Sequence, residues 1–155
     1  NRVSGGKYMR VYLDNCSYNR PYDDKTFPVV QMEAEAKLFI QRLIQENKIE
    51  LVISFMSLKE NDDNPYIERK INISNFFPYA CCIIDETFVE SAIQISNQIS
   101  KAGIKNKDAL HVACAIIAKC NYFITTDKRL LKLENKAIVL INPIQFIAIW
   151  GENNG

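Results

Sequence analysis

Apolar residues in this chain form short runs that alternate with longer stretches in which they recur every three or four positions. The short runs are rich in β-branched and aromatic residues, as in Val11-Tyr12-Leu13 and Leu51-Val52-Ile53. Runs of this length and composition predict β-strands. We expect strands at residues 10–13, 51–53, 81–84, 122–125 and 138–141, with a packed connector as the alternative at 81–84.

The longer stretches predict helices. Between residues 29 and 47, one helical stripe holds Ala36, Phe39, Ile40, Leu43 and Ile44. Residues 109–118 are almost continuously apolar, which predicts a helix buried nearly all round. Further helices are expected from about residue 54 to the turn at Asn64-Pro65, and at 66–76, 85–101, 129–133 and 143–150. Residues 15–28 are polar and predict an irregular segment.

Strands that alternate with helices predict an α/β domain with a mainly parallel sheet of roughly five strands. The 155 residues suit one domain with one core. We expect that domain at residues 9–150, after a flexible leader at 1–8 and before a tail at 151–155. Because ligands of such sheets collect beyond the carboxyl ends of the strands, residues that follow strands are the candidates for chemistry.

The amino-acid composition restricts the class of protein and its compartment, but it does not indicate a function. The chain has 48% hydrophobic and 24% charged residues, and its net charge of +1 gives no overall sign of nucleic-acid binding. The five cysteines include no C-x-x-C pair, so we expect buried thiols, such as Cys81, Cys82 and Cys114, in a reducing compartment. A secretory signal and an apolar run of about 20 residues are both absent, which predicts a cytoplasmic protein without a membrane partner.

Four carboxylates fall where such a sheet would bring them together. Asp14 and Asp127 directly follow predicted strands. Glu60 lies on the helix after the second strand, and Asp108 opens the buried helix. Carboxylates held close together repel and raise one another's pKa, so a fold that gathers four of them usually needs a cation. Oxygen ligands favour Mg²⁺ or Mn²⁺ over zinc, and such ions activate water for attack on a phosphodiester.

Each acid also has a structural interpretation. Asp14 could satisfy a turn, Asp108 and Asp127 suit helix N-termini, and Glu60 suits a solvated helix face. Other chemistries fit less well. Cys16 stands where a haloacid-dehalogenase-like phosphatase needs its second Asp, and no glycine-rich phosphate loop occurs.

Four segments, in order, resemble motifs of the PIN-domain family and of its VapC-like ribonucleases. They are Val11-Tyr12-Leu13-Asp14-Asn15, Val52-Ile53-Ser54 with Leu58-Lys59-Glu60, Lys107-Asp108-Ala109-Leu110-His111-Val112-Ala113, and Phe123-Ile124-Thr125-Thr126-Asp127-Lys128-Arg129-Leu130. The resemblance runs from about Met9 to Pro143. If the second motif is aligned in a shifted register, Asp62 or Asp63 takes the place of Glu60. The segment after Asp14 lacks the small Thr or Ser that commonly follows the first acid, which indicates a divergent subgroup.

The resemblance implies a Rossmann-like, three-layer α/β/α sandwich and endonucleolytic cleavage of RNA with Mg²⁺ or Mn²⁺. Its catalytic and metal-binding residues would be Asp14, Glu60, Asp108 and Asp127. Many relatives are toxins of toxin–antitoxin pairs and form homodimers, so an antitoxin and a second copy of the chain are the expected partners. A non-catalytic module that binds RNA or protein is the main alternative, and action on structured DNA is a weaker one.

Residues near the acids in sequence are candidates for supporting the site or contacting substrate phosphates. They are Asn15, Arg20, Thr125, Thr126 and Lys128. Ordinary strand-end hydrogen bonds and solvated charges are the alternative interpretations of these residues. His111, the only histidine, lies three residues after Asp108 and so on roughly the same side of the helix, where a structural role is expected.

Overall fold

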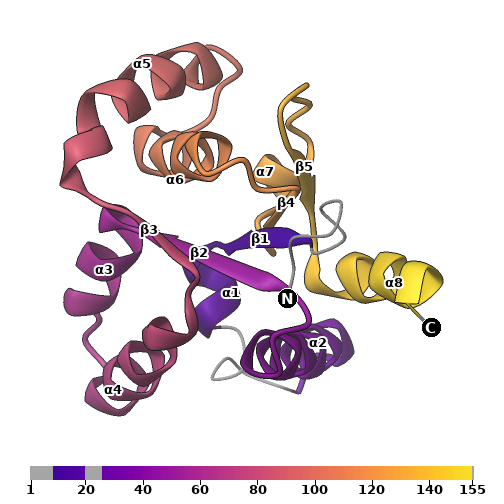
Figure 1. The fold of residues 1–155 in the computed structure, drawn as a ribbon. Coiled ribbons are helices and arrows are strands. Elements are labelled where there is room, and N and C mark those ends of the chain that lie inside the picture. The colour runs from indigo at the N-terminus through magenta and orange to yellow at the C-terminus, as the bar shows by residue number, and fades with distance from the viewer. Residues whose placement is uncertain (1–8, 20–25, 155) are drawn as a thin grey trace.

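The computed structural model describes residues 9–19 and 26–154, which form a five-stranded sheet with helices on both faces (Figure 1). All paired strands are parallel, in the order β3-β2-β1-β4-β5. The strands are β1 (Arg10–Leu13), β2 (Glu50–Ser54), β3 (Cys82–Ile84), β4 (Tyr122–Ile124) and β5 (Val139–Ile141). The predicted fold class and all five strands are confirmed, while the expected leader and Arg20 lie outside the described residues.

Two helical layers enclose the sheet. On one face lie α1 (Asn15–Asn19), α2 (Pro28–Gln45), α4 (Ile67–Phe76) and α8 (Pro143–Asn154). On the other face, α5 (Val89–Ser100) and α6 (Asn106–Ile117) pack against each other and against the sheet (Figure 1). Shorter connecting elements are α3 (Phe55–Asp62), the 3-10 turns η3 (Phe77–Tyr79) and η4 (Glu86–Phe88), and α7 (Lys128–Leu131).

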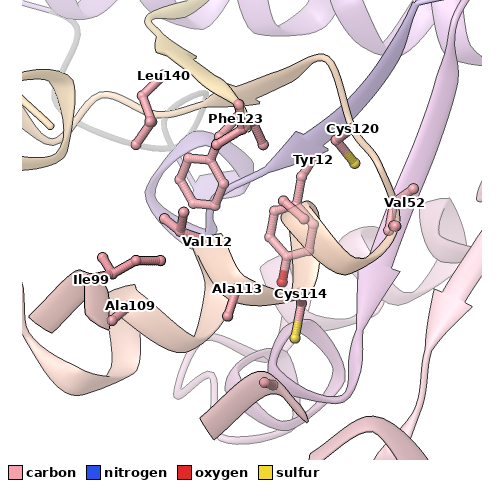
Figure 2. Close-up of a cluster of buried hydrophobic side chains, with 14 of the residues drawn as sticks. Tyr12, Val52, Ile99, Ala109, Val112, Ala113, Cys114, Cys120, Phe123 and Leu140 are labelled. Atoms are coloured by element: carbon pink, nitrogen blue, oxygen red, sulfur yellow. The ribbon is translucent and has the colours of Figure 1, made fainter. Parts of the chain in front are cut away.

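Successive residues of β1 face opposite layers, as the pleat of a strand requires. Val11 and Leu13 join the core between the sheet and α2, whereas Tyr12 joins the core between the sheet and α6. The Tyr12 ring stacks on Phe123 with centroids 5.3 Å apart, close to Val112 of α6 (Figure 2). Because both faces of the sheet are buried, the strands are continuous apolar runs that stand out in the sequence.

The end of β2 leads directly into α3 through a capping box. The Ser54 hydroxyl accepts hydrogen bonds from the backbone N–H groups of Met56, at 3.1 Å, and Ser57, at 3.4 Å. In return, the Ser57 hydroxyl accepts a hydrogen bond from the Ser54 N–H at 3.1 Å. This arrangement fixes where α3 starts and therefore where Glu60, near the end of the helix, projects.

Two predicted elements differ in the structure. Residues 15–19 form α1 instead of an irregular segment, and the Asp14 carbonyl accepts hydrogen bonds from the N–H groups of Ser17 and Tyr18. Such a short helix shows no apolar stripe, so periodicity could not reveal it. Asp85 caps η4 as an N-cap residue, and α5 begins only at Val89.

The expectation of buried cysteines is only partly correct. None of the five cysteines forms a disulfide, and Cys114 and Cys120 are buried. Cys81, however, is exposed, and Cys16 and Cys82 are only partly buried. Cys81 precedes β3, which lies at the edge of the sheet, so fewer neighbours cover it than an apolar sequence context implied.

The C-terminal helix α8 continues to Asn154, into the segment expected to be a tail. Its single tryptophan, Trp150, packs against Phe39 of α2 with ring centroids 6.0 Å apart. Among the helices that the structure describes, none combines the length and the apolar character needed to cross a bilayer.

Candidate functional site

A pocket of about 700 Å³ lies beyond the carboxyl ends of β1 and β4, where a parallel sheet is expected to bind ligands. Its lining includes Asp14, Glu60, Asp108 and Asp127, which come from different parts of the chain, and also Asp63 directly after α3. Asn15 lines the same pocket. The structure therefore brings together the four carboxylates that the sequence singled out.

Asp14 is buried and held by hydrogen bonds from two side chains. The Thr125 hydroxyl donates to Asp14 Oδ2 at 2.7 Å, and the Cys16 thiol donates to the same oxygen at 3.2 Å. The Asp14 backbone N–H donates to the Ile124 carbonyl at 3.0 Å, which extends the pairing of β1 with β4. Both the backbone and the carboxylate of Asp14 are thus fixed by the segment that ends β4.

Thr125 connects this acid to Asp127. Its hydroxyl donates to Asp14 and accepts from the Asp127 N–H at 3.0 Å. Asp127 is the N-cap of α7, because Oδ1 accepts from the N–H groups of Arg129, at 2.7 Å, and Leu130, at 3.3 Å. The structural role considered for Asp127 is therefore present, and the same residue also lines the pocket.

Thr126 has a different environment from Thr125. It is buried, its N–H donates to Cys16 Sγ at 3.3 Å, and its hydroxyl has no hydrogen-bond partner among the described residues. A buried hydroxyl without a partner is costly in a folded protein. Thr126 therefore has an unused donor and acceptor beside the residues that hold Asp14.

The pKa of Asp108 shows the effect of the negative charges gathered in the pocket. It lies in the first turn of α6, and its pKa is raised, first by burial and then by the charges of Asp14 and Asp127, with a smaller contribution from Glu60. All three of the other acids therefore act on this carboxylate. Oxygen ligands in an excess of negative charge are what Mg²⁺ and Mn²⁺ require, so the donor chemistry of the pocket fits a divalent cation.

Glu60 lies beside an imidazole and an ammonium group. Its Oε1 lies 2.9 Å from His111 Nε2, and its Oε2 lies 3.6 Å from Lys107 Nζ. Burial alone would raise the pKa of Glu60, but the contacts with His111 and then Lys107 lower it below its ordinary value. For the shifted register, Asp62 lies outside the pocket and pairs with Lys70, whereas Asp63 lines the pocket while it pairs with Lys59.

The side chains do not form a ready-made metal cage. Within residues 9–19 and 26–154, no group of three or more His, Cys, Asp or Glu side chains is arranged to hold a metal ion. A cation shared by the four acids would therefore have to draw their side chains closer together. The donors are of the right kind, and their convergence is incomplete.

Basic residues line the same pockets as the acids. Arg69, Lys105 and Lys107 line the acidic pocket. A neighbouring pocket of about 430 Å³ shares Lys105, Asp108 and Asp127 with it and adds Lys128, Arg129 and Lys132. Of the expected phosphate contacts, Lys128 thus lies beside the site, in the adjoining pocket.

Sequence reasoning missed several residues that line the acidic pocket. They are Asn19, Tyr66, Arg69 and Lys105. The Arg69 guanidinium lies over the Tyr66 ring, 4.1 Å from its centroid. The turn at Asn64-Pro65 was visible in the sequence, but nothing there indicated that it would bring the start of α4 to the pocket.

Comparison with known proteins gives a match in structure alone. No model of a known protein family matches the sequence, and no curated protein matches it. In structure, the chain is similar to VapBC2 from Rickettsia felis, which was crystallised bound to a DNA fragment from its promoter. The similarity covers 86% of this chain and 98% of the other, with a TM-score of 0.53 and 18% sequence identity. This chain has a PIN-like fold. The PIN-like domain is the three-layer, Rossmann-type sandwich expected from its sequence.

Proposed function

We propose that this PIN-like domain is an endoribonuclease that hydrolyses RNA phosphodiester bonds with the help of Mg²⁺ or Mn²⁺. The observation that carries the proposal is the meeting of four carboxylates from separate elements in one pocket, where three of them raise the pKa of Asp108. Asp14, Glu60, Asp108 and Asp127 would hold the cation. When bound, it would supply an activated water and neutralise charge on the phosphate.

The protein's own residues would prepare the site for this reaction. Thr125 holds Asp14 and the Asp127 backbone in fixed relative positions, so the two strand-end acids present a constant geometry. Asn15, which lines the pocket, would hydrogen-bond a water or a phosphate oxygen. Preorganised donors of this kind avoid reorganisation during the reaction.

The charges around the pocket support a polyanionic substrate. Basic side chains line both pockets that contain the acids: Arg69, Lys105 and Lys107 in the acidic pocket, and Lys105, Lys128, Arg129 and Lys132 in the adjoining one. A nucleic-acid backbone that runs through these pockets would meet cations close to the acids. Contacts of this kind make binding dependent on salt, since they release counterions.

We also propose protein partners. The likeness to VapBC2 motivates an antitoxin partner and action as a cytoplasmic toxin. A groove of about 340 Å³ between α2 and α8, lined mainly by apolar residues such as Met32, Phe39 and Ile147, supports contact with a protein, including a second copy of the chain. Light scattering during gel filtration, with the chain alone, tests the homodimer.

The second candidate is a non-catalytic module that binds RNA or protein. It is favoured by the incomplete convergence of the acids, which leaves no preformed metal group among the described residues. The two candidates differ in a simple way. RNA bound without being cut, equally in Mn²⁺ and in chelator, supports the module.

The deciding experiment compares wild type with Asp14→Asn and Asp108→Asn on labelled single-stranded RNA in Mn²⁺. We expect each variant to lose more than about 100-fold in cleavage rate, beyond the cost typical of residues that only support metal ligands. Asp62→Asn is the matched control, because Asp62 lies on the same helix as Glu60 but does not line the pocket. Cleavage that survives both changes, and persists in chelator, would contradict the proposal.

A further inference from the structure

A chain of buried polar side chains connects the start of α3 to Glu60. The Tyr12 hydroxyl lies 2.6 Å from Ser54 Oγ, 3.1 Å from Ser57 Oγ and 2.6 Å from His111 Nδ1. The other ring nitrogen of His111, Nε2, lies 2.9 Å from Glu60 Oε1. Ser54, Tyr12 and His111 are all at most 1% exposed, so water does not compete for these contacts.

The direction of the hydrogen bonds follows from counting donors and acceptors. Ser54 Oγ already accepts from two backbone N–H groups, and Ser57 Oγ accepts from one. Each serine hydroxyl has a single hydrogen, and Tyr12 Oη is the shortest contact open to both, since the two serine oxygens lie 3.5 Å apart. Tyr12 therefore accepts from Ser54, and the arrangement in which it also accepts from Ser57 leaves its own hydrogen for His111.

In that arrangement Tyr12 donates to His111. Complete burial raises the pKa of the phenol well above its ordinary value, so the hydroxyl keeps its hydrogen. With its lone pairs facing the serines, that hydrogen is directed at His111 Nδ1, 2.6 Å away. A neutral imidazole whose Nδ1 accepts carries its own hydrogen on Nε2.

The Nε2 hydrogen faces the carboxylate of Glu60. Two unprotonated acceptors would repel each other at the observed 2.9 Å, so the separation itself calls for a hydrogen between them. At this distance Nε2 still has no hydrogen bond of regular geometry among the described residues, so the proposed bond needs a small adjustment of the two side chains.

We propose that His111 is a positioning residue that binds Glu60 Oε1 and so directs Oε2 toward the cation. The inference rests on the proposed metal-dependent function. Tyr12 sets the imidazole tautomer, and the two serines of the capping box set the orientation of Tyr12. The same residues that start α3 thereby fix the carboxylate near its end. In the absence of a cation, Oε2 is next to Lys107 Nζ, whose side chain is mostly exposed and can move away.

This role parallels that of Thr125 on the opposite side of the pocket. Thr125 donates to one oxygen of Asp14, and His111 faces one oxygen of Glu60. Metal-binding carboxylates are commonly oriented in this way by a hydrogen bond to the oxygen that does not bind the metal. Loss of such a partner typically costs about 10–100-fold in metal affinity.

The first test is the tautomer of His111, read by nitrogen NMR of the untagged protein. Because the chain has one histidine, its ring signals need no assignment. We expect hydrogen on Nε2 and an acceptor signal from Nδ1. Tyr12→Phe should populate both tautomers, and Glu60→Gln should shift the Nε2–H signal. Hydrogen on Nδ1 in wild type, or no response to Glu60→Gln, would overturn the proposal.

The second test is Mn²⁺ affinity by calorimetry. His111→Leu should weaken binding about 10–100-fold, whereas His111→Gln, whose amide can donate near the Nε2 position, should restore most of it. A purely structural role would not distinguish these variants once both are shown to be folded by circular dichroism. Equal affinity in wild type and His111→Leu would contradict the positioning role.

The two proposals fail in different ways. A wild-type protein that binds no Mn²⁺ and cuts no RNA would contradict the proposed function. The tautomer and the Glu60→Gln comparison need neither metal nor RNA, so they would still decide whether His111 holds Glu60.

Discussion

Among single residues, Asp108 destabilises the folded state when its carboxylate is ionised. Its pKa is raised by burial and by three neighbouring acids. A raised pKa means that the folded chain binds this proton more tightly than the unfolded chain. The protonated Asp108 therefore contributes fully to stability below the ordinary pKa of aspartate, and this contribution is lost as the pH rises through the folded-state pKa.

At neutral pH, Asp108→Asn should stabilise the metal-free protein. Screening in this half-exposed position limits the gain to about 1 kcal/mol, or roughly 2–4 °C in Tm for a chain of this size. The loss of a favourable helix-dipole contact, about 0.3–1 kcal/mol, acts in the opposite direction, but the raised pKa indicates that repulsion and burial outweigh it.

Thermal melts in chelator, followed by fluorescence, measure this effect, with Asp62→Asn as the control. Excess Mn²⁺ should raise the Tm of wild type more than that of Asp108→Asn. A lower Tm for Asp108→Asn in chelator would show that the helix-terminal role of Asp108 dominates.

Lys37 is a second residue whose ionisation is unfavourable in the folded protein. Only 1% of it is exposed, and burial lowers its pKa from 10.5 to about 7. Its amine lies 4.9 Å from the centroid of the Tyr18 ring and 5.4 Å from that of Phe76, and Glu33 lies one turn earlier on α2. Between about pH 7 and 10.5 the unfolded chain holds more protons at this residue, so its contribution to stability rises with pH.

Lys37→Met should therefore stabilise the protein most below about pH 7, by roughly 1–4 kcal/mol. Loss of the ring contacts would offset about 1 kcal/mol of that gain. Urea unfolding at about pH 6 and pH 9 measures the difference, with the exposed Lys136→Met as control. A gain that is the same at both pH values would show that burial does not shift the titration of Lys37.

The four acids were predictable from the sequence because strand ends and helix starts are marked by local patterns. Asp14 and Asp127 follow apolar runs, and Asp108 precedes one. Lys37 was not predictable, because a lysine beside an apolar stripe ordinarily points to solvent. Its burial depends on α1 and α4 packing over it, which no local pattern encodes.

At the scale of elements, one residue at the junction of β2 and α3 has three structural roles. Ser54 ends the strand, caps the helix and hydrogen-bonds Tyr12 in the core. The sequence predicted a helix near residue 54, but not the link between its cap and a buried tyrosine. That link needs β1 and β2 to be neighbours, and the order of parallel strands cannot be read from periodicity.

Ser54→Ala should lower the free energy of unfolding by about 2–4 kcal/mol. Loss of the cap accounts for about 1 kcal/mol, and the poorly satisfied Tyr12 hydroxyl adds about 1–3 kcal/mol. Ser100→Ala is a suitable control, because its hydroxyl makes a single exposed hydrogen bond, to Asn106. Urea titrations that give equal losses for both variants would show that the buried connection adds nothing to stability.

At the scale of the whole molecule, the sheet divides two cores and collects the acids at one edge. The α/β class, the strands and the acidic edge were all predicted, since each follows from alternation of elements and from what comes after a strand. The neighbouring pocket and the approach of Tyr66 and Arg69 were not, because they depend on how α4 and α7 are placed in space.

The hydrogen-bond chain through Tyr12 and His111 has a consequence for how this sequence can diverge. Replacing Tyr12 by Phe would leave His111 Nδ1 without its donor, and replacing His111 by Leu would leave a buried hydroxyl facing an apolar group. Either substitution alone should lower the free energy of unfolding more than the two substitutions together. Descendants of this chain should therefore keep both residues or exchange both, so that the two positions vary as a pair although 98 residues separate them in the sequence.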